Sequence, residues 1–223
     1  MVSFIKSDNP GLGEIDLARE LSTLLAEDKK VLWIISGGSN IAIEATIMRQ
    51  LDQNKTHNLR IILGDERYGQ KGHSDSNEKQ LSDKGFTFGN SLFTPILEEK
   101  SLAETTEDFA EKLSDLISWA DEIIGQFGIG DDGHISGILP SSDAIENQNL
   151  TASYRADDFT RITMTVNAIK KLSKAYVFCF GNAKKNALEN LMEKNKSISD
   201  MPSMVVYSIP NVYVYNDLIG GNI

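Results

Sequence analysis

The chain has 223 residues, a length that suits one α/β domain, and residues 1–223 are expected to form a single domain. Lys and Arg number 22 against 32 Asp and Glu, a net charge of -10. This charge argues against a nucleic-acid partner, because nucleic acids are bound mainly through Lys and Arg. The single cysteine, Cys179, excludes an internal disulfide, and its apolar surroundings make it a core residue.

The sequence gives no sign of a targeting or membrane segment. The N-terminal segment lacks a basic stretch followed by an apolar stretch, so no signal peptide is expected. No apolar run approaches the roughly 20 residues that a membrane-spanning helix needs. We therefore predict a cytoplasmic protein without a membrane partner, present as a monomer or a homodimer.

Helix-like and strand-like segments alternate along the chain. Apolar residues at helical spacing predict helices over residues 15–25, 41–51, 104–120 and 183–194. Short apolar runs predict strands over residues 31–35, 60–63, 122–127, 175–180, 204–207 and 212–215, and the polar stretch 68–77 is predicted to be a loop. Such alternation is typical of a three-layer α/β protein with a doubly wound, mainly parallel, Rossmann-like sheet.

The segment Ser36-Gly37-Gly38-Ser39 lies between a predicted strand and a predicted helix. Glycines let the backbone approach a ligand closely, and free N–H groups at a helix start bind anions. The alternative is a tight turn with a serine cap. The segment is not a P-loop, since the Gly-Lys-Ser/Thr ending is absent. Because ligands bind beyond the carboxyl ends of parallel strands, we expect this segment at a site there.

Charged residues follow the next predicted strand and open the last predicted helix. Asp65-Glu66-Arg67 could hold a polar substrate, with Arg67 forked onto a phosphate, or could form an internal ion pair at the sheet edge. Lys184 stands where a lysine can reach back over the sheet edge to a phosphate. Alone, Lys184 is weak evidence for a site.

A third segment, Gly128-Ile129-Gly130-Asp131-Asp132-Gly133-His134, follows another predicted strand. The glycines favour an unusual backbone path that aims the imidazole of His134 into a cleft, and histidine suits acid–base work near neutral pH. The alternative is a capping or exposed histidine in a turn. No metal site is predicted, because His57, His73 and His134 fall at no ligand spacing. A serine hydrolase is excluded, since no Gly-x-Ser-x-Gly elbow occurs.

Taken in order, these segments resemble one family. They are Ser36 to Ser39, Asp65-Glu66-Arg67 with Ser76-Asn77, Gly128 to His134 with Leu139-Pro140, Arg161-Ile162-Thr163-Met164-Thr165, Gly181 and Lys184. From about residue 15 to 215 the chain resembles 6-phosphogluconolactonases, members of the glucosamine-6-phosphate isomerase/6-phosphogluconolactonase superfamily. The resemblance implies the sheet of the glucosamine-6-phosphate deaminase/6-phosphogluconolactonase type.

The deaminases of that superfamily share the Asp-Gly-His segment. They usually carry tyrosine where this chain has Arg67, and a catalytic glutamate where it has Leu139, so both positions favour the lactonase. The chain departs from the usual lactonase pattern at Asn40-Ile41, Tyr68-Gly69 and Ser136-Gly137-Ile138. These departures are expected to affect substrate choice and rate more than the fold.

The resemblance implies binding and hydrolysis of a small phosphorylated sugar lactone, 6-phospho-D-glucono-1,5-lactone, with no metal and no organic cofactor. The expected phosphate site comprises the backbone of Gly37, Gly38 and Ser39, with charge from Arg67 and Lys184. Arg161 either touches the phosphate or pairs with an acid on the neighbouring strand. Its role stays open at this point.

The resemblance also implies that His134 is the general base that activates water, oriented by Asp132 or Asp65. Backbone N–H groups near Gly133 would hold the developing oxyanion. Two alternative functions are a glucosamine-6-phosphate deaminase/isomerase and a non-catalytic sugar-phosphate-binding sensor. Leu139 argues against the deaminase, and the presence of His134 argues against the sensor.

Overall fold

The computed structural model of the chain describes residues 1–156 and 159–222. Its larger sheet contains β1 (Val2–Lys6), β2 (Val31–Ile35), β3 (Leu59–Leu63), β5 (Leu92–Thr94), β6 (Glu122–Gly128), β9 (Lys174–Cys179), β10 (Asn211–Asn216) and β11 (Gly221–Asn222). Within the described residues the order is β11-β1-β10-β9-β6-β2-β3-β5, and every neighbouring pair is parallel except β11 with β1. The predicted α/β fold with a mainly parallel sheet is confirmed.

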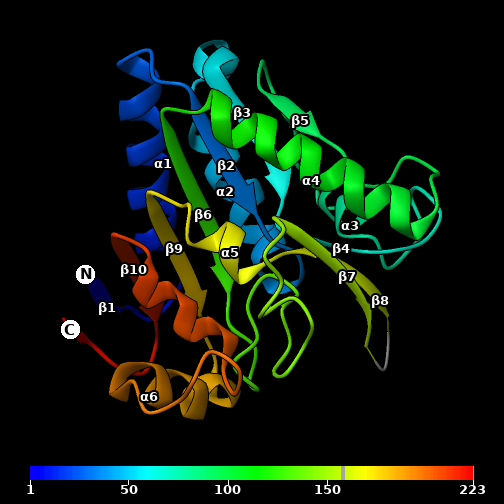
Figure 1. Cartoon of the computed structure of the whole chain (residues 1–223). Helices are drawn as coiled ribbons and strands as arrows, with labels where there is room; N and C mark the ends of the chain where they lie inside the picture. The colour runs from blue at the N-terminus through cyan, green and yellow to red at the C-terminus, as the bar shows by residue number, and fades with distance from the viewer. Residues whose placement is uncertain (157–158, 223) are drawn as a thin grey trace.

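A smaller antiparallel sheet stands beside the larger one (Figure 1). Its order is β4 (Asp65–Arg67), β8 (Thr160–Met164) and β7 (Thr151–Arg155). The β4 strand follows directly on β3, because Gly64 donates its N–H to Ile35 O at 2.7 Å and its carbonyl accepts the N–H of Met164 at 2.8 Å. The segment Asp65-Glu66-Arg67 is therefore not only a strand end but the first strand of this second sheet.

Helices cover both faces of the larger sheet. They are α1 (Gly11–Ala26), α2 (Ile41–Gln50), α3 (Asn77–Asp83), α4 (Leu102–Trp119), α5 (Val166–Ile169) and α6 (Lys185–Glu193). In Figure 1, α4 and α5 lie in front of the sheet, α2 lies behind it, and α1 packs against α2. The smaller sheet joins the front layer, where β7 packs against α4.

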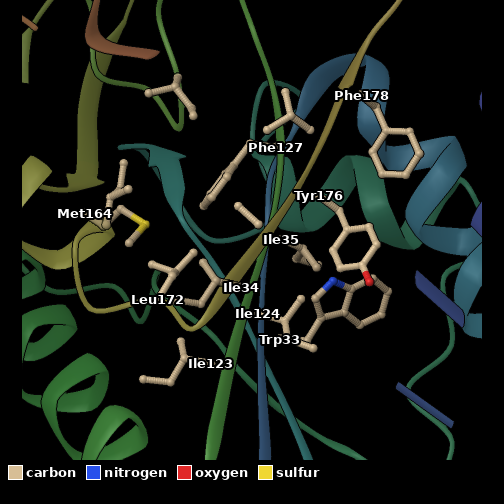
Figure 2. Close-up of a cluster of buried hydrophobic side chains, with 14 of the residues drawn as sticks. Trp33, Ile34, Ile35, Ile123, Ile124, Phe127, Met164, Leu172, Tyr176 and Phe178 are labelled. Carbon is tan, nitrogen blue, oxygen red and sulfur yellow. The ribbon is translucent and has the colours of Figure 1, made fainter. Parts of the chain in front are cut away.

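The core lies on both faces of the central strands. All five residues of β2 are fully buried, as expected for the middle of a parallel sheet covered on both sides. Figure 2 shows the two faces: Ile34, Phe127, Met164 and Leu172 point to one side of the strands, and Trp33, Tyr176 and Phe178 point to the other. The period of two along each strand thus fixes which residues face each helical layer.

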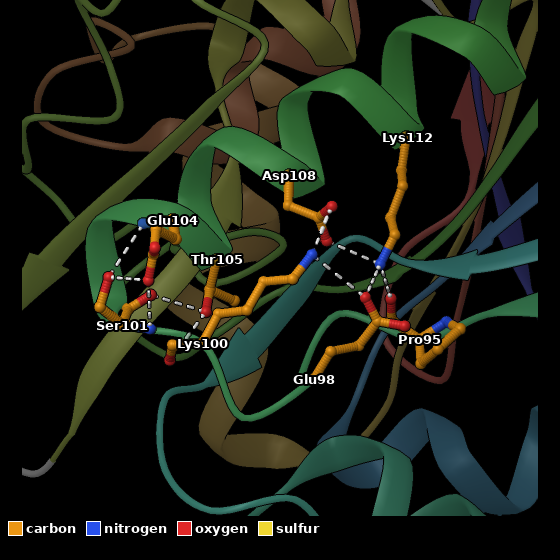
Figure 3. Close-up of polar contacts among 8 residues, drawn as sticks. All are labelled: Pro95, Glu98, Lys100, Ser101, Glu104, Thr105, Asp108 and Lys112. Carbon is orange, nitrogen blue, oxygen red and sulfur yellow. Dashed lines mark hydrogen bonds and ion pairs between the residues drawn. The ribbon is translucent and has the colours of Figure 1, made fainter.

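The start of α4 is held by hydrogen bonds and ion pairs (Figure 3). Ser101 and Glu104 form a capping box, in which each side chain satisfies a backbone N–H of the other. Lys112 Nζ lies 2.7 Å from both Glu98 Oε2 and Asp108 Oδ2, which ties α4 to the segment before it. The helix predicted over residues 104–120 is confirmed and begins two residues earlier, at Leu102.

The strand predicted over residues 204–207 is wrong. The segment forms the 3-10 helix Pro202–Ser208, and Met204, Val205 and Val206 are all buried there. A short apolar run does not distinguish a buried strand from a buried helical turn, and Pro202 favours the start of a helix. Several short elements were not predicted from the sequence, namely the strands β1, β5, β7, β8 and β11 and the helices α3 and α5.

Candidate active site

A cavity of about 220 Å³ lies beyond the carboxyl ends of β2 and β6. From β2 the chain proceeds outward to β3 and β5, whereas from β6 it proceeds the other way to β9 and β10. These two adjacent strands therefore flank the point where the strand order reverses, which is where α/β sheets bind ligands. The Ser36–Ser39 segment lies beyond the carboxyl ends of the strands, as expected, and residues of the charged segments line the same cavity.

Nearly every site residue predicted from the sequence lines the cavity. Gly37, Gly38, Ser39, Asp65, Arg67, His134, Arg161 and Lys184 all line it. Asp132 does not line the cavity but contacts His134 directly. The structure thus brings the predicted residues together, while the role of each one stays a prediction.

The Ser36–Ser39 segment forms one wall of the cavity. A Cβ atom on Gly37 would lie 2.0 Å from Oδ1 of Asn77, so only glycine allows this close approach of the loop to α3. In the described part of the chain, the N–H groups of Gly37, Gly38 and Ser39 have no hydrogen-bond acceptor. These N–H groups are therefore available to an anionic ligand at the start of the helical segment that continues into α2.

Glu66 and its neighbour Asp65 have different environments. The fully buried carboxylate of Glu66 accepts the N–H groups of Arg67 and Asn77 at 2.7 Å each, and the Ser76 hydroxyl at 3.0 Å. It thereby fixes the start of α3 against β4, so the role of Glu66 is structural. Asp65 instead faces the cavity, and Asn77 Nδ2 donates to its backbone carbonyl at 2.9 Å.

The two arginines of the smaller sheet lie side by side. Arg67 on β4 is the register partner of Arg161 on β8, so both side chains project from the same face of the sheet into the cavity. Both guanidinium groups also contact the ring of Phe159, at 5.4 and 5.7 Å from its centroid. The Arg67 guanidinium donates to Asp75 O at 2.9 Å, which orients it.

Lys184 adds a third positive charge from the other side, beyond β9. In residues 1–156 and 159–222, neither Lys184 nor either arginine forms an ion pair. The ion pair considered for Asp65-Glu66-Arg67 is accordingly not formed in this part of the chain, nor is one between Arg161 and an acid. The cavity therefore holds a local positive cluster in a chain of net charge -10, which suits an anionic ligand.

The imidazole of His134 is held by Asp132. Nδ1 lies 2.7 Å from Asp132 Oδ1, and the same oxygen accepts the backbone N–H of His134 at 3.0 Å. Burial opposes the charged form of Asp132, but the hydrogen bond from the His134 N–H and the nearby imidazole lower its pKa below the ordinary value. An ionised carboxylate only accepts hydrogen bonds, so in the neutral imidazole Nδ1 carries the proton and Nε2 has the free lone pair.

Gly130 makes this arrangement possible. A Cβ atom at that position would lie 2.1 Å from His134 Nδ1 and 2.4 Å from Asp132 Oδ1. Any side chain there would displace the imidazole. The glycine-flanked histidine that the sequence pointed to therefore has a steric explanation, and Asp132 rather than Asp65 makes the hydrogen bond to the ring.

Asp65 lies beneath the turn that follows His134. A Cβ atom on Gly137 would meet Asp65 Oδ2 at 2.7 Å. Burial raises the pKa of Asp65 above its ordinary value, although the charges of Arg67, Arg161 and His134 oppose this shift. The carboxyl of Asp65 is thus close enough to the imidazole and to both arginines to interact with each of them electrostatically.

The turn after His134 contains a strained residue, Ser136, and is held by hydrogen bonds from the smaller sheet. Ser136 has a φ of 48°, a left-handed conformation that costs a non-glycine residue roughly 1–3 kcal/mol. The Thr163 hydroxyl donates to Ser136 O, and the Tyr154 hydroxyl donates to Gly137 O and accepts the Leu139 N–H at 3.1 Å. The small sheet therefore holds the turn in place. Sequence reasoning missed Tyr154, because a tyrosine on a weakly patterned strand gives no local signal.

The cavity wall also presents buried polar atoms that lack partners. In the described residues, four of these atoms belong to lining side chains that are at least nine-tenths buried: Ser36 Oγ, Asn40 Oδ1, Asn77 Oδ1 and Ser136 Oγ. Buried polar groups normally have hydrogen-bond partners, so such atoms around a cavity indicate a ligand rich in donors and acceptors. Asn40 and Ser136 are also positions where the chain departs from the lactonase pattern.

Comparison with known proteins identifies the family of this chain. A family model described as Glucosamine-6-phosphate isomerases/6-phosphogluconolactonase matches residues 14–214. The chain belongs to this family. The 6-phosphogluconolactonase of Helicobacter pylori (strain J99) is 30% identical over 164 residues, 69% of this chain and 69% of the relative. The glucosamine-6-phosphate deaminase of Staphylococcus saprophyticus is 24% identical over 208 residues, 83% of this chain and 84% of the relative.

Solved structures of both lactonases and deaminases of the glucosamine-6-phosphate isomerase/6-phosphogluconolactonase family also match the chain. A 6-phosphogluconolactonase from Shewanella baltica OS155 matches with a TM-score of 0.80 at 24% sequence identity, covering 97% of both chains. A monomeric glucosamine-6-phosphate deaminase matches with the same TM-score of 0.80 at 19% identity, again covering 97% of both. Similarity at these identities shows the fold, so the choice between the two activities depends on the site residues.

Two further properties of this family member concern metals and membranes. Among residues 1–156 and 159–222, no group of three or more His, Cys, Asp or Glu side chains is placed to hold a metal ion. None of the helices in the same residues is both long and apolar enough to cross a bilayer. The predicted location and oligomeric state stay predictions.

Proposed function

We propose that this chain hydrolyses 6-phospho-D-glucono-1,5-lactone to 6-phosphogluconate, the lactone-opening step of the oxidative pentose phosphate pathway. One observation carries the proposal. His134, hydrogen-bonded through Nδ1 to Asp132, lines the same cavity as Arg67, Arg161 and Lys184. An oriented base beside a positive cluster suits a substrate that has both an anionic group and a bond open to attack by water. The family relatives named 6-phosphogluconolactonase support this choice.

The phosphate end of the substrate is assigned to the Ser36–Ser39 wall. The unpartnered N–H groups of Gly37, Gly38 and Ser39 supply donors, and the nearby cations supply charge. The buried polar atoms of Asn40 and Ser136 provide partners for the sugar hydroxyls. Anchoring both groups places the lactone carbonyl at a fixed distance from the phosphate, which favours reaction by orientation.

In the proposed reaction His134 accepts a proton from water and later returns it to the ring oxygen. Nε2 of His134 takes a proton from water as the water oxygen attacks the lactone carbonyl carbon, giving a tetrahedral oxyanion. The ionised Asp132 stabilises the imidazolium formed at this point. The C1–O5 bond then breaks, the imidazolium returns its proton to the departing ring oxygen, and the free carboxylic acid of 6-phosphogluconate results. The donors expected near Gly133 are not assigned to the oxyanion, because the N–H groups of Gly133 and His134 already donate to Gly130 O and Asp132 Oδ1.

The deaminase activity of some relatives is the main competing function. Its ring-opening and proton-transfer chemistry uses an acid at the position of Leu139, whose apolar side chain transfers no proton. Leu139 lies in the turn whose backbone is held by Tyr154. A non-catalytic sensor would have no need for the oriented pair of His134 and Asp132.

The test is hydrolysis of freshly generated 6-phospho-D-glucono-1,5-lactone with the uncatalysed rate subtracted. Wild type should accelerate hydrolysis, and His134→Ala should lower kcat by about 10²–10⁴ with little change in KM. His57→Ala is the matched control, because His57 lies exposed beside Asp28, outside the cavity lining. Ammonia release from glucosamine 6-phosphate, without lactone hydrolysis, would instead establish the deaminase. Binding of 6-phosphogluconate without either turnover would establish the sensor.

A further inference from the structure

The helix α2 buries a carboxyl group directly behind the Ser36–Ser39 wall. Glu44 is fully buried, and its Oε1 accepts the backbone N–H of Ser36 at 2.9 Å. Its Oε2 has no hydrogen-bond partner in the described residues. A carboxyl group is costly to bury, and an alanine or leucine would suit the apolar face of α2 better. The hydrogen bond to Ser36 offsets part of this cost.

Ser36 is the first residue after β2, where the chain turns from the sheet into the loop. Its N–H is buried, so without Glu44 this donor would have no partner. The next residue, Gly37, packs against the side chain of Asn77 on α3. The loop is thus held by Glu44 at Ser36 and by Asn77 at Gly37.

We propose that Glu44 is a positioning residue of the anion site: by accepting the Ser36 N–H it fixes the conformation in which the Gly37, Gly38 and Ser39 N–H groups face the cavity. The inference rests on the proposed function insofar as that function places a phosphate on this loop. Glu44 does not line the cavity, so it acts on the ligand through the loop. A loop fixed before binding loses less conformational entropy when the phosphate binds.

Charge is consistent with this role. Burial raises the pKa of Glu44 well above its ordinary value, the hydrogen bond from Ser36 opposes the shift, and the nearby Asp65 adds to it. The shift is toward the neutral form, which repels a phosphate less than a charged carboxylate would. Glutamine has the same shape and keeps a carbonyl oxygen to accept the Ser36 N–H, so Glu44→Gln should preserve the loop.

The experiment titrates inorganic phosphate and 6-phosphogluconate into wild type and four variants by isothermal calorimetry, with melting temperatures recorded in parallel. Glu44→Leu removes the acceptor, and Kd for both anions should rise about tenfold. Glu44→Gln should keep Kd near wild type. Met48→Ala is the matched control, because Met48 is equally buried on α2; it should lower the melting temperature and leave Kd unchanged.

Glu44→Asp is the second test, in case Glu44→Leu does not fold. Its carboxyl is one methylene shorter and no longer reaches Ser36, so Kd should again rise. Unchanged Kd in Glu44→Leu or Glu44→Asp overturns the inference, as does a Glu44→Gln variant that binds as weakly as Glu44→Leu. Wild type that binds neither anion also overturns it. Wild type that binds both anions but does not hydrolyse the lactone contradicts only the proposed function.

Discussion

Oδ1 of Asp132 accepts two hydrogen bonds from His134, one from the backbone N–H at 3.0 Å and one from the ring Nδ1 at 2.7 Å. One carboxylate oxygen therefore fixes both the backbone turn and the imidazole plane. Because the ring is held through Nδ1, Nε2 is the atom presented for proton transfer. This geometry separates the residue that transfers the proton from the residue that orients it.

Replacing Asp132 by asparagine tests that separation. Asp132→Asn keeps the size of the side chain but removes the charge that stabilises the imidazolium, so kcat should fall about tenfold or more while KM stays near wild type. The acid limb of the kcat pH profile should move to lower pH, since the protonated ring loses its counter-charge. Asp131→Asn, next to it in the sequence and outside the cavity lining, is the control. An unchanged pH profile would contradict the role given to Asp132.

Removing one arginine of the cavity should weaken substrate binding. Arg67→Ala and Arg161→Ala should each raise KM about 10- to 100-fold with a smaller effect on kcat, because a charge-assisted hydrogen bond contributes about 1.5–3 kcal/mol. Arg49→Ala removes the same charge from an exposed position on α2 and should leave KM unchanged. Steady-state kinetics on the lactone distinguish the cases. A loss confined to kcat would mean that the arginines do not bind the phosphate.

Tyr154 fastens the turn that carries Ser136 and Gly137. Its hydroxyl bonds to Gly137 O and to the Leu139 N–H, so Tyr154→Phe should lower the free energy of unfolding by about 1–3 kcal/mol. Because the turn lines the cavity, kcat/KM should fall several-fold as well. Tyr213→Phe, on β10 away from the cavity lining, provides the comparison in denaturant unfolding and in activity. Equal effects of the two changes would remove any special role for Tyr154.

The buried carboxyl of Glu44 predicts a pH-dependent stability difference. Burial raises its folded-state pKa above the ordinary value of 4.5, so the folded protein keeps a proton that the unfolded chain releases. Stability is therefore lost as pH rises from about 4.5 toward the folded-state pKa. Glutamine does not titrate, so the melting temperature of Glu44→Gln relative to wild type should increase over that range. A constant difference from pH 4.5 to 8 would show that the folded-state pKa of Glu44 is not raised.

Much of the fold was predictable because the central strands are short runs of mostly apolar residues. Val31–Ile35 is wholly apolar and is followed by Ser36 and two glycines, a run bounded by turn residues as expected for a buried parallel strand. The same reasoning failed for the 3-10 helix Pro202–Ser208, whose apolar run has strand-like composition. Its burial depends on what packs over it, and residue type alone does not specify that.

The site was predictable to a similar extent. Residues in glycine-rich segments after strands, such as Gly37 and His134, were found because parallel topology brings those segments together. Glu44 and Tyr154 were not found, since each contacts the site through the backbone of another segment. The sequence left both Asp132 and Asp65 as partners for the imidazole, and only the three-dimensional path of the loop distinguishes them.

The pairing of β4 with β8 has a consequence for the protein without its ligand. Register places Arg67 opposite Arg161, and two like charges on neighbouring strands repel each other. Sheet hydrogen bonds, the Phe159 ring and the nearby Asp65 carboxyl oppose that repulsion, which still costs the fold some stability. A doubly charged anion that contacts both would restore it. Such a ligand would then stabilise the folded protein in proportion to its occupancy of the cavity.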